Sequence, residues 1–186
     1  CTFVKNGSFG GDFDKMFGTI VGALYSGGLT VNLNNCTSSN NTLDGNAYSI
    51  PCGFIQNGDT LLVDGGVYIA DGLTYKTAEK AYYVTNANGL ATLNAMMANK
   101  TAGKNVKVVL GNDIDFTGKT WTPVDSHADT AFYFNEFDGK GHTISNLTIN
   151  GQAMFTRFAG SGNVTIKNVT FDNAQVNSNG NINTSI

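Results

Sequence analysis

The sequence predicts an all-β fold, a right-handed single-stranded parallel β-helix (solenoid) with a short capping α-helix. Three observations predict it: the composition, a short motif that recurs along the chain, and one isolated helical segment. The 186 residues include 23 Gly, 24 Asn and 21 Thr but only 2 Pro. Gly and Asn tolerate left-handed backbone angles and Thr favours strands, so this composition is typical of many short strands joined by tight turns.

The recurring motif is apolar-x-apolar-x-Asn-apolar-Thr. It occurs at residues 142–149 and again at 164–171, an offset of 22 residues, and a shorter version lies at 31–37. Apolar residues alternate before the asparagine, as in a strand with one buried face, and the phase changes after it. Asparagine accepts a left-handed conformation, so it can turn the corner, and its side chain can form ladders between coils. The expected corner residues are Asn35, Asn146 and Asn168. The offset predicts a coil of 22 residues.

One stretch, residues 85–99, departs from the strand pattern. Its apolar residues at 90, 93, 96 and 97 have helical spacing. Residues 85–88 offer oxygens for the helix N-cap, and Gly103 offers a stop. A stripe of this kind is usually core. Leu90, Leu93 and Met97 are therefore expected to cover the open end of the β-helix, where apolar side chains and strand edges would otherwise be exposed.

The order of segments after this helix resembles a known family. The matching features are the helix with Leu90 and Leu93, then residues 113–116, 121–124 and 137–147. Together they resemble the opening of GLUG-motif β-helix domains, found in bacterial surface adhesins and in non-catalytic regions of some surface proteases. The match spans roughly residues 82–176 and departs from the family pattern at 153–156. The resemblance implies an extracellular, repetitive, non-enzymatic scaffold.

The order of coils and cap predicts two parts. Residues 1–75 look like later coils of a β-helix, yet they precede the capping helix and first coils of residues 76–186. The first part can be the end of a preceding module. Alternatively, its coils can complete the open end of another copy in a head-to-tail assembly. A third reading makes the whole chain one continuous helix, with residues 85–100 as a lateral insertion.

Charge and hydropathy exclude several classes of protein. Charged residues make up only 13% of the chain, the net charge is −3, and no Lys/Arg run occurs, so nucleic-acid binding is not expected. No apolar stretch approaches the roughly 20 residues of a membrane span, so membrane insertion is not expected either. No cofactor is expected.

The three cysteines do not form a CxxC motif, so a zinc site is not expected. Cys36 and Cys52 either form a disulfide, if the strands that carry them stack, or are two small buried apolar side chains. Cys1 would fit a lipidated mature N-terminus. However, Phe3 follows where a polar tether is usual, so lipidation is not expected.

Carboxylate pairs are the strongest candidates for chemistry, because some β-helix proteins cleave polysaccharides. Residues two apart on a strand share a face, so each pair could hold an acid and a base, or calcium. The pairs are Asp12 with Asp14, Asp113 with Asp115, and Glu136 with Asp138. No pair has a second acid pair one coil away, and Arg157 is the only arginine. His127 and His142 do not have the spacing of a metal site, and His142 is expected to cap a turn.

Aromatic residues and glycosylation sequons give two further alternatives. Tyr82, Tyr83, Trp121, Phe132 and Tyr133 could form a sugar-stacking surface, but Trp121 and Phe132 are expected in the core. Sequons begin at Asn6, Asn35, Asn40, Asn99, Asn146, Asn163, Asn168 and Asn183. In a secreted eukaryotic or viral protein they could carry glycans, but Asn146 and Asn168 follow more simply from the corner motif.

These observations predict a protein that is not an enzyme. The expected function is an extracellular structural or adhesion scaffold, a rigid β-helical rod on a cell surface or in a head-to-tail filament. Its expected partners are other copies of itself, by end-to-end stacking of coils, and host surface glycans or proteins. The alternatives are a structural protein of a virion or phage tail, and a polysaccharide-active β-helix enzyme.

Overall fold

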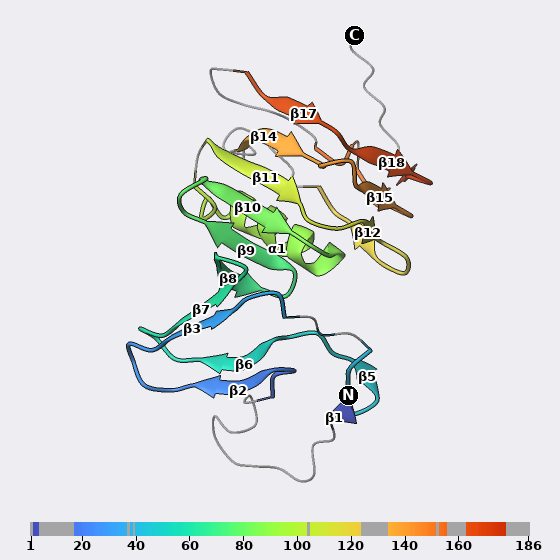
Figure 1. The fold of residues 1–186 in the computed structure, drawn as a ribbon. Coiled ribbons are helices and arrows are strands. Elements are labelled where there is room, and N and C mark those ends of the chain that lie inside the picture. Colours follow the sequence, from blue (N-terminus) through green and yellow to red (C-terminus); the bar gives the residue numbers. More distant parts are fainter. Residues whose placement is uncertain are drawn as a thin grey trace.

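The computed structural model describes residues 2–3, 17–36, 38, 40–103, 105–123, 134–151, 153–155 and 163–177. Within them the chain is a parallel β-solenoid of about five turns with a single short helix, so the predicted fold class is confirmed (Figure 1). The elements are β1 Thr2–Phe3, β2 Val21–Leu24, β3 Thr30–Leu33, β4 Thr42–Leu43, β5 Asn46–Ala47, β6 Cys52–Ile55, β7 Thr60–Val63, β8 Gly66–Ala70, β9 Leu73–Lys76, β10 Ala81–Val84, α1 Ala87–Ala98, β11 Val106–Leu110, β12 Ile114–Asp115, β13 Thr120–Trp121, β14 Phe134–Asp138, β15 Thr143–Ser145, β16 Thr148–Asn150, β17 Thr165–Lys167, β18 Thr170–Asp172 and β19 Gln175–Asn177.

The C-terminal coils have three faces of parallel strands. β11, β14 and β17 stack on the first face, β12, β15 and β18 on the second, and β13, β16 and β19 on the third. Thr143 pairs with Thr170, and Thr148 with Gln175, so this coil is 27 residues long. The predicted coil of 22 residues was therefore wrong.

The error arises from a shorter repeat within each coil. One face takes about five residues: a three-residue strand, a corner asparagine and one apolar residue, as in 165–169 and 170–174. β17 resembles β15 in sequence, but β17 stacks on β14 and β15 stacks on β18. The offset of 22 thus spans one coil of 27 residues less one five-residue face, and it matches strands that lie on different faces.

The N-terminal coils run in the opposite strand direction. β3 pairs parallel with β7 in the same eight-stranded sheet that contains β11, β14 and β17. Between them, β7 with β8, β8 with β9 and β9 with β10 are all antiparallel pairs. β10 then pairs parallel with β11. Three successive reversals leave β3 and β7 antiparallel to the C-terminal strands of this sheet.

The two hydrophobic cores lie on opposite faces of this shared sheet. Val63 of β7 packs against the N-terminal core, whereas its neighbour Leu62 points to the other face. Leu62 pairs with Val67, Val67 with Tyr75, and Tyr75 with Tyr82, so these side chains share one face. Tyr82 belongs to the C-terminal core.

The N-terminal coils are therefore not earlier turns of the winding that β11 begins, and the reading of one continuous helix was wrong. This arrangement is compatible with both other interpretations. The N-terminal coils can be the end of a preceding module, or they can complete the open end of another copy. The division predicted between residues 75 and 76 falls within β9 and stays a prediction.

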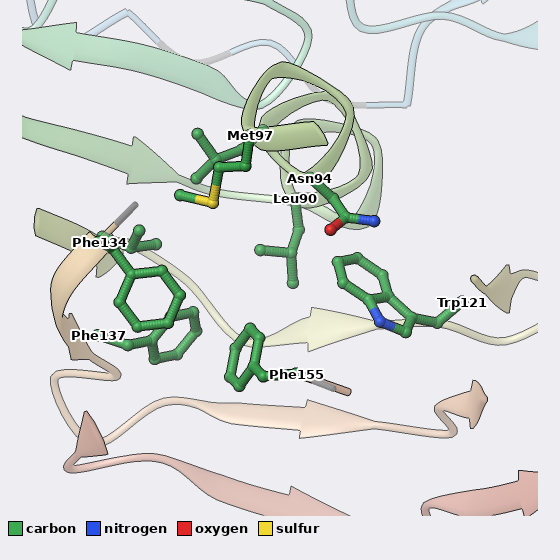
Figure 2. A pocket seen from close by; sticks show the side chains of 9 residues that line it. Leu90, Asn94, Met97, Trp121, Phe134, Phe137 and Phe155 are labelled. Atoms are coloured by element: carbon green, nitrogen blue, oxygen red, sulfur yellow. The ribbon is translucent and has the colours of Figure 1, made fainter. Parts of the chain in front are cut away.

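The helix α1 covers the start of the C-terminal core. The Asn86 side chain caps its N-terminus by accepting a hydrogen bond from the Gly89 N–H at 2.9 Å. Leu90, Leu93 and Met97 are all buried in this core. Figure 2 shows Leu90 and Met97 pointing from the helix toward Phe134, Phe155 and Trp121 across a cavity of about 10 Å³. That volume is close to the minimum for one water molecule, so the helix fills the end of the core almost completely.

The cysteine pairing was offered as an alternative, and the structure has both thiols free. Cys36 is exposed and follows β3, whereas Cys52 is buried in β6, which pairs with β2 in a different sheet. The condition for a disulfide, stacking of the strands that carry the two cysteines, is therefore not met. Cys52 has the alternative role, a small buried side chain of the N-terminal core. Cys1 lies outside the described residues.

In the described ranges, no helix has both the length and the apolar character that a membrane crossing requires.

Candidate functional site

The candidate carboxylates of the C-terminal coils lie at corners between strands, where they bind the neighbouring coil. Asp115 ends β12, and its Oδ1 accepts hydrogen bonds from the N–H and hydroxyl of Thr117 at 2.9 and 2.8 Å. The Asn146 Nδ2, one coil later, donates to the same oxygen at 2.9 Å. Asn173 on the next coil donates to the Asn146 Oδ1 at 2.8 Å. Asp115, Asn146 and Asn173 thus form a side-chain ladder across three coils.

The predicted corner asparagines adopt the conformation expected for them. Asn35, Asn146 and Asn168 have φ angles of 53°, 55° and 53°, in the left-handed region. Asn168 joins a second ladder, because its Nδ2 donates to the Asp138 Oδ1 at 3.0 Å. Asn35 uses its backbone instead: its N–H donates to the Asp64 Oδ1 at 2.8 Å. Each of these corners is therefore tied to an aspartate on a neighbouring coil or strand.

Asp113 and His142 form a third link between coils. The Asp113 Oδ1 accepts a hydrogen bond from the Thr143 N–H at 2.9 Å and lies 3.2 Å from the His142 Nδ1. The His142 N–H donates to the Gly139 carbonyl at 2.8 Å, so this residue is part of the turn before β15. The Thr143 N–H, followed by the His142 ring, lowers the pKa of the Asp113 carboxyl below its ordinary value.

Asp138 is the buried member of the pair formed with Glu136. Burial opposes its ionisation, but the Lys140 N–H at 3.0 Å, the Asn168 amide and the Lys140 ammonium outweigh it and lower the pKa of Asp138 to about 2. Its pair partner Glu136 lies 3.7 Å from the Lys107 Nζ and 3.2 Å from the Lys167 Nζ. Lys167 also lies 3.8 Å from Asp138, so both acids are matched by lysines on neighbouring strands.

These carboxylates are poorly suited to general acid catalysis. The Asn146 amide, then Thr117, lowers the pKa of Asp115, so Asp113, Asp115 and Asp138 all have lowered pKa values. Each is ionised at neutral pH, whereas a glycosidase acid requires a raised pKa. Among the described residues, no three His, Cys, Asp or Glu side chains are grouped to hold a metal ion. The predicted residues Asp12, Asp14 and His127 lie outside the described ranges.

No protein-family model, no curated protein and no solved structure matches the chain.

The aromatic surface offered as an alternative does not form from those of its residues that the structure describes. Tyr82 and Trp121 are buried, where the Tyr82 hydroxyl donates to the Ala102 carbonyl and the Trp121 Nε1 to the Met154 carbonyl, both at 2.9 Å. Trp121 is thus in the core, as expected, but Tyr82 was wrongly offered as an exposed ring. Phe132 and Tyr133 lie outside the described residues. Tyr83, next to Tyr82 on β10, points to the opposite face of the sheet.

Tyr83 lines a groove that the sequence analysis missed. This groove, hereafter the junction groove, has a volume of about 600 Å³ and lies where the N-terminal coils meet the outer face of β8, β9 and β10. Its lining includes Leu33, Ser49, Val63, Asp64, Tyr68, Asp71, Thr74, Lys76, Tyr83, Asn86 and Asn112. No sequence pattern marks the groove. The groove forms because the N-terminal core lies on one face of the shared sheet and the C-terminal core lies on the other.

Asp138→Asn is expected to make the free energy of unfolding decrease less steeply as the pH falls. The folded pKa of about 2 lies below the unfolded value of about 3.9, so ionised Asp138 stabilises the fold above pH 4, and this contribution is lost as the pH falls toward 2. Urea unfolding followed from pH 7 to pH 2 measures it. Asp172→Asn is the matched control, because Asp172 is exposed and no described residue binds its carboxylate. Equal pH slopes for Asp138→Asn and the unmodified protein would contradict the assignment.

Substitutions of Asn146 are expected to separate its backbone and side-chain roles. Asn146→Gly keeps the left-handed corner and loses the ladder bonds, at about 0.5–1.5 kcal/mol each. Asn146→Ala loses the same bonds and also places a Cβ at φ 55°, which costs about 1–2 kcal/mol more. Urea unfolding should rank the alanine variant below the glycine variant. Asn150→Ala, at an exposed strand end, is the control and should change stability little. The reverse ranking would rule out the corner role.

Proposed function

We propose that this protein is a non-catalytic structural scaffold, a rigid β-solenoid segment that spaces or carries other parts on an extracellular surface. The observation that carries the proposal is that the polar corner residues form hydrogen bonds between successive coils. Asp115, Asn146 and Asn173 bond to one another across three coils, and Asp138 bonds to Asn168. Groups that would be candidates for chemistry are thus engaged in holding successive coils in register.

The composition and the resemblance to GLUG-motif β-helix domains support the extracellular and adhesive part of this proposal. A chain with 13% charged residues and abundant Asn and Thr relies on backbone and amide hydrogen bonds more than on ion pairs such as that of Lys167 with Glu136. Hydrogen bonds of this kind are insensitive to salt, unlike exposed ion pairs, which salt screens. Such a scaffold is suited to an environment of variable ionic strength.

End-to-end stacking is part of the same proposal. The last described coil exposes Ile166, Phe171 and Val176, of which 43%, 43% and 52% of the surface is accessible. Their register partners one coil earlier, Phe137, Ile144 and Ile149, are buried. Another coil packed on this surface would bury the exposed side chains in the same way. Light scattering over a wide concentration range tests this part: rods that lengthen with concentration support stacking, and a monomer at every concentration contradicts it.

The scaffold proposal requires the two cores to form one rigid body. Spin labels at Asn57→Cys and Asn135→Cys, in a variant with Cys1→Ser, Cys36→Ser and Cys52→Ala, would report the distance between the N-terminal and C-terminal coils. A pulsed electron resonance experiment should give a single narrow distribution. The control pair Asn135→Cys and Asp172→Cys lies entirely in the C-terminal coils and should be narrow in any case. A broad distribution for the first pair alone would contradict a rigid scaffold.

The non-catalytic part has a separate test. The unmodified protein is incubated with acidic and neutral polysaccharides from pH 4 to pH 8, and released reducing ends are measured. We expect none. Release that Asp113→Asn or Asp138→Asn abolishes, in protein that remains folded, would overturn the proposal and favour the polysaccharide-active alternative.

A further inference from the structure

We propose that the junction groove is a binding site for a neutral oligosaccharide. This goes beyond the scaffold proposal, because it gives one surface of the protein a ligand of its own. A volume of about 600 Å³ lies within the range of about 300–1,000 Å³ typical of ligand sites.

The floor of the groove is the outer face of three neighbouring strands. Tyr68 on β8 pairs with Thr74 on β9, and Thr74 pairs with Tyr83 on β10, so the three side chains form a row. Two strand spacings separate the tyrosines by about 10 Å. Aromatic rings pack against the C–H faces of sugars while their hydroxyls bond to polar groups. A row of ring, hydroxyl and ring, in which Tyr68 packs partly against the N-terminal core and Lys76 lies over the Tyr83 ring, fits two linked sugar units.

Polar groups that are held in place surround this floor. The Asp71 carboxylate accepts hydrogen bonds from the Ser49 hydroxyl at 2.8 Å and from the Asn88 amide at 2.9 Å. The Lys76 Nζ lies 4.3 Å from the centre of the Tyr83 ring. Burial, and then the nearby Asp71 carboxylate, raises the pKa of Tyr68 to about 12, so its hydroxyl stays protonated and can donate at physiological pH. Fixed donors and acceptors of this kind suit the hydroxyl groups of a sugar.

Charge selects a neutral ligand over an anionic one. Asp64 and Asp71 give the lining two carboxylates against the single ammonium of Lys76, which already stacks on Tyr83. An anionic sugar or a phosphate would be repelled. Since β8, β9 and β10 are paired on both sides, the floor also offers no free strand edge on which an extended peptide could add.

Binding is tested by titrating the full chain with cellotetraose, maltotetraose and lacto-N-tetraose in separate calorimetric experiments, with 3′-sialyllactose as the anionic comparison. We expect at least one neutral tetrasaccharide to bind at millimolar concentration or below, and sialyllactose not to bind. Tyr83→Ala should weaken the binding at least tenfold. Thr74→Val, which keeps the shape of the side chain and removes the hydroxyl, should weaken it severalfold.

Tyr25→Ala is the matched control, because Tyr25 is 62% exposed and lies outside the groove. Its affinity should equal that of the unmodified protein. Thermal unfolding of each variant separates lost binding from lost folding, and Thr74→Val keeps the test valid if Tyr83→Ala unfolds. The proposal is overturned if no neutral tetrasaccharide binds at millimolar concentration, if sialyllactose binds in their place, or if Tyr83→Ala and Thr74→Val bind normally. None of these outcomes affects the spin-label test of the scaffold.

Discussion

Phe137→Ala is expected to destabilise the C-terminal core by about 3–5 kcal/mol, the range for a large aromatic side chain removed from a packed core. Phe137 is fully buried, and its ring centre lies 6.0 Å from that of Phe134 and 5.4 Å from that of Phe155. Figure 2 shows it beside the cavity beneath the helix. Its removal would join the new space to a cavity that already exists, so the surrounding side chains cannot close it.

The measurement is urea unfolding followed by the fluorescence of Trp121, which is the only tryptophan and belongs to the same core. Phe171→Ala is the control, because Phe171 of β18 stacks on the buried Ile144 of the preceding coil but is itself 43% exposed. Its loss should cost less than about 1 kcal/mol. Equal losses for the two variants would contradict the view that the last described coil is the open end of this core.

The residues that define the fold class were visible in the sequence because each acts locally. The left-handed region favours Asn and Gly through local sterics, so Asn35, Asn146 and Asn168 could be predicted from their motif alone. The stripe of Leu90, Leu93 and Met97 likewise required only helical spacing. Local chemistry of this kind gives the strands, the corners and the cap.

The stacking register was wrongly predicted, because it depends on which five-residue faces lie above one another. β15 and β17 are similar in sequence, and nothing local distinguishes a partner on the same face from one on the next face. A comparison of Thr143–Ile149 with Thr170–Val176, which share Thr-apolar-polar-Asn-apolar-polar-apolar, would have given the 27-residue coil. The pair of segments 22 residues apart is more similar in sequence, although its strands β15 and β17 lie on different faces.

The junction groove was hidden for a different reason. The strands that form its floor and walls are joined through the antiparallel pairs from β7 to β10. Those pairs place the two cores on opposite faces of the sheet, and the groove forms where they meet. Tyr82 and Tyr83 illustrate the consequence. They are adjacent and chemically identical, yet one is buried in the core and the other lines the groove.

Gly89→Ala is expected to destabilise the protein by about 2–3 kcal/mol, although helix propensity alone predicts a gain of about 1 kcal/mol. Gly89 lies in the first turn of α1, where a Cβ would be 2.0 Å from the Gly72 carbonyl oxygen. That carbonyl cannot move freely, because it accepts a hydrogen bond from the Thr85 N–H at 2.9 Å. The helix would have to lift from the turn, which would withdraw Leu90 and its neighbours from the core.

Whether Gly89→Ala lowers or raises the free energy of unfolding therefore distinguishes the effect of packing from that of helix propensity. Urea unfolding followed by Trp121 fluorescence measures it, and Ala95→Gly is the control at an exposed position of the same helix. The control should lose about 1 kcal/mol through propensity alone. If Gly89→Ala were instead more stable than the unmodified protein, α1 would not be seated on the Gly72 turn, and its role as the cap of the C-terminal core would be lost with that contact.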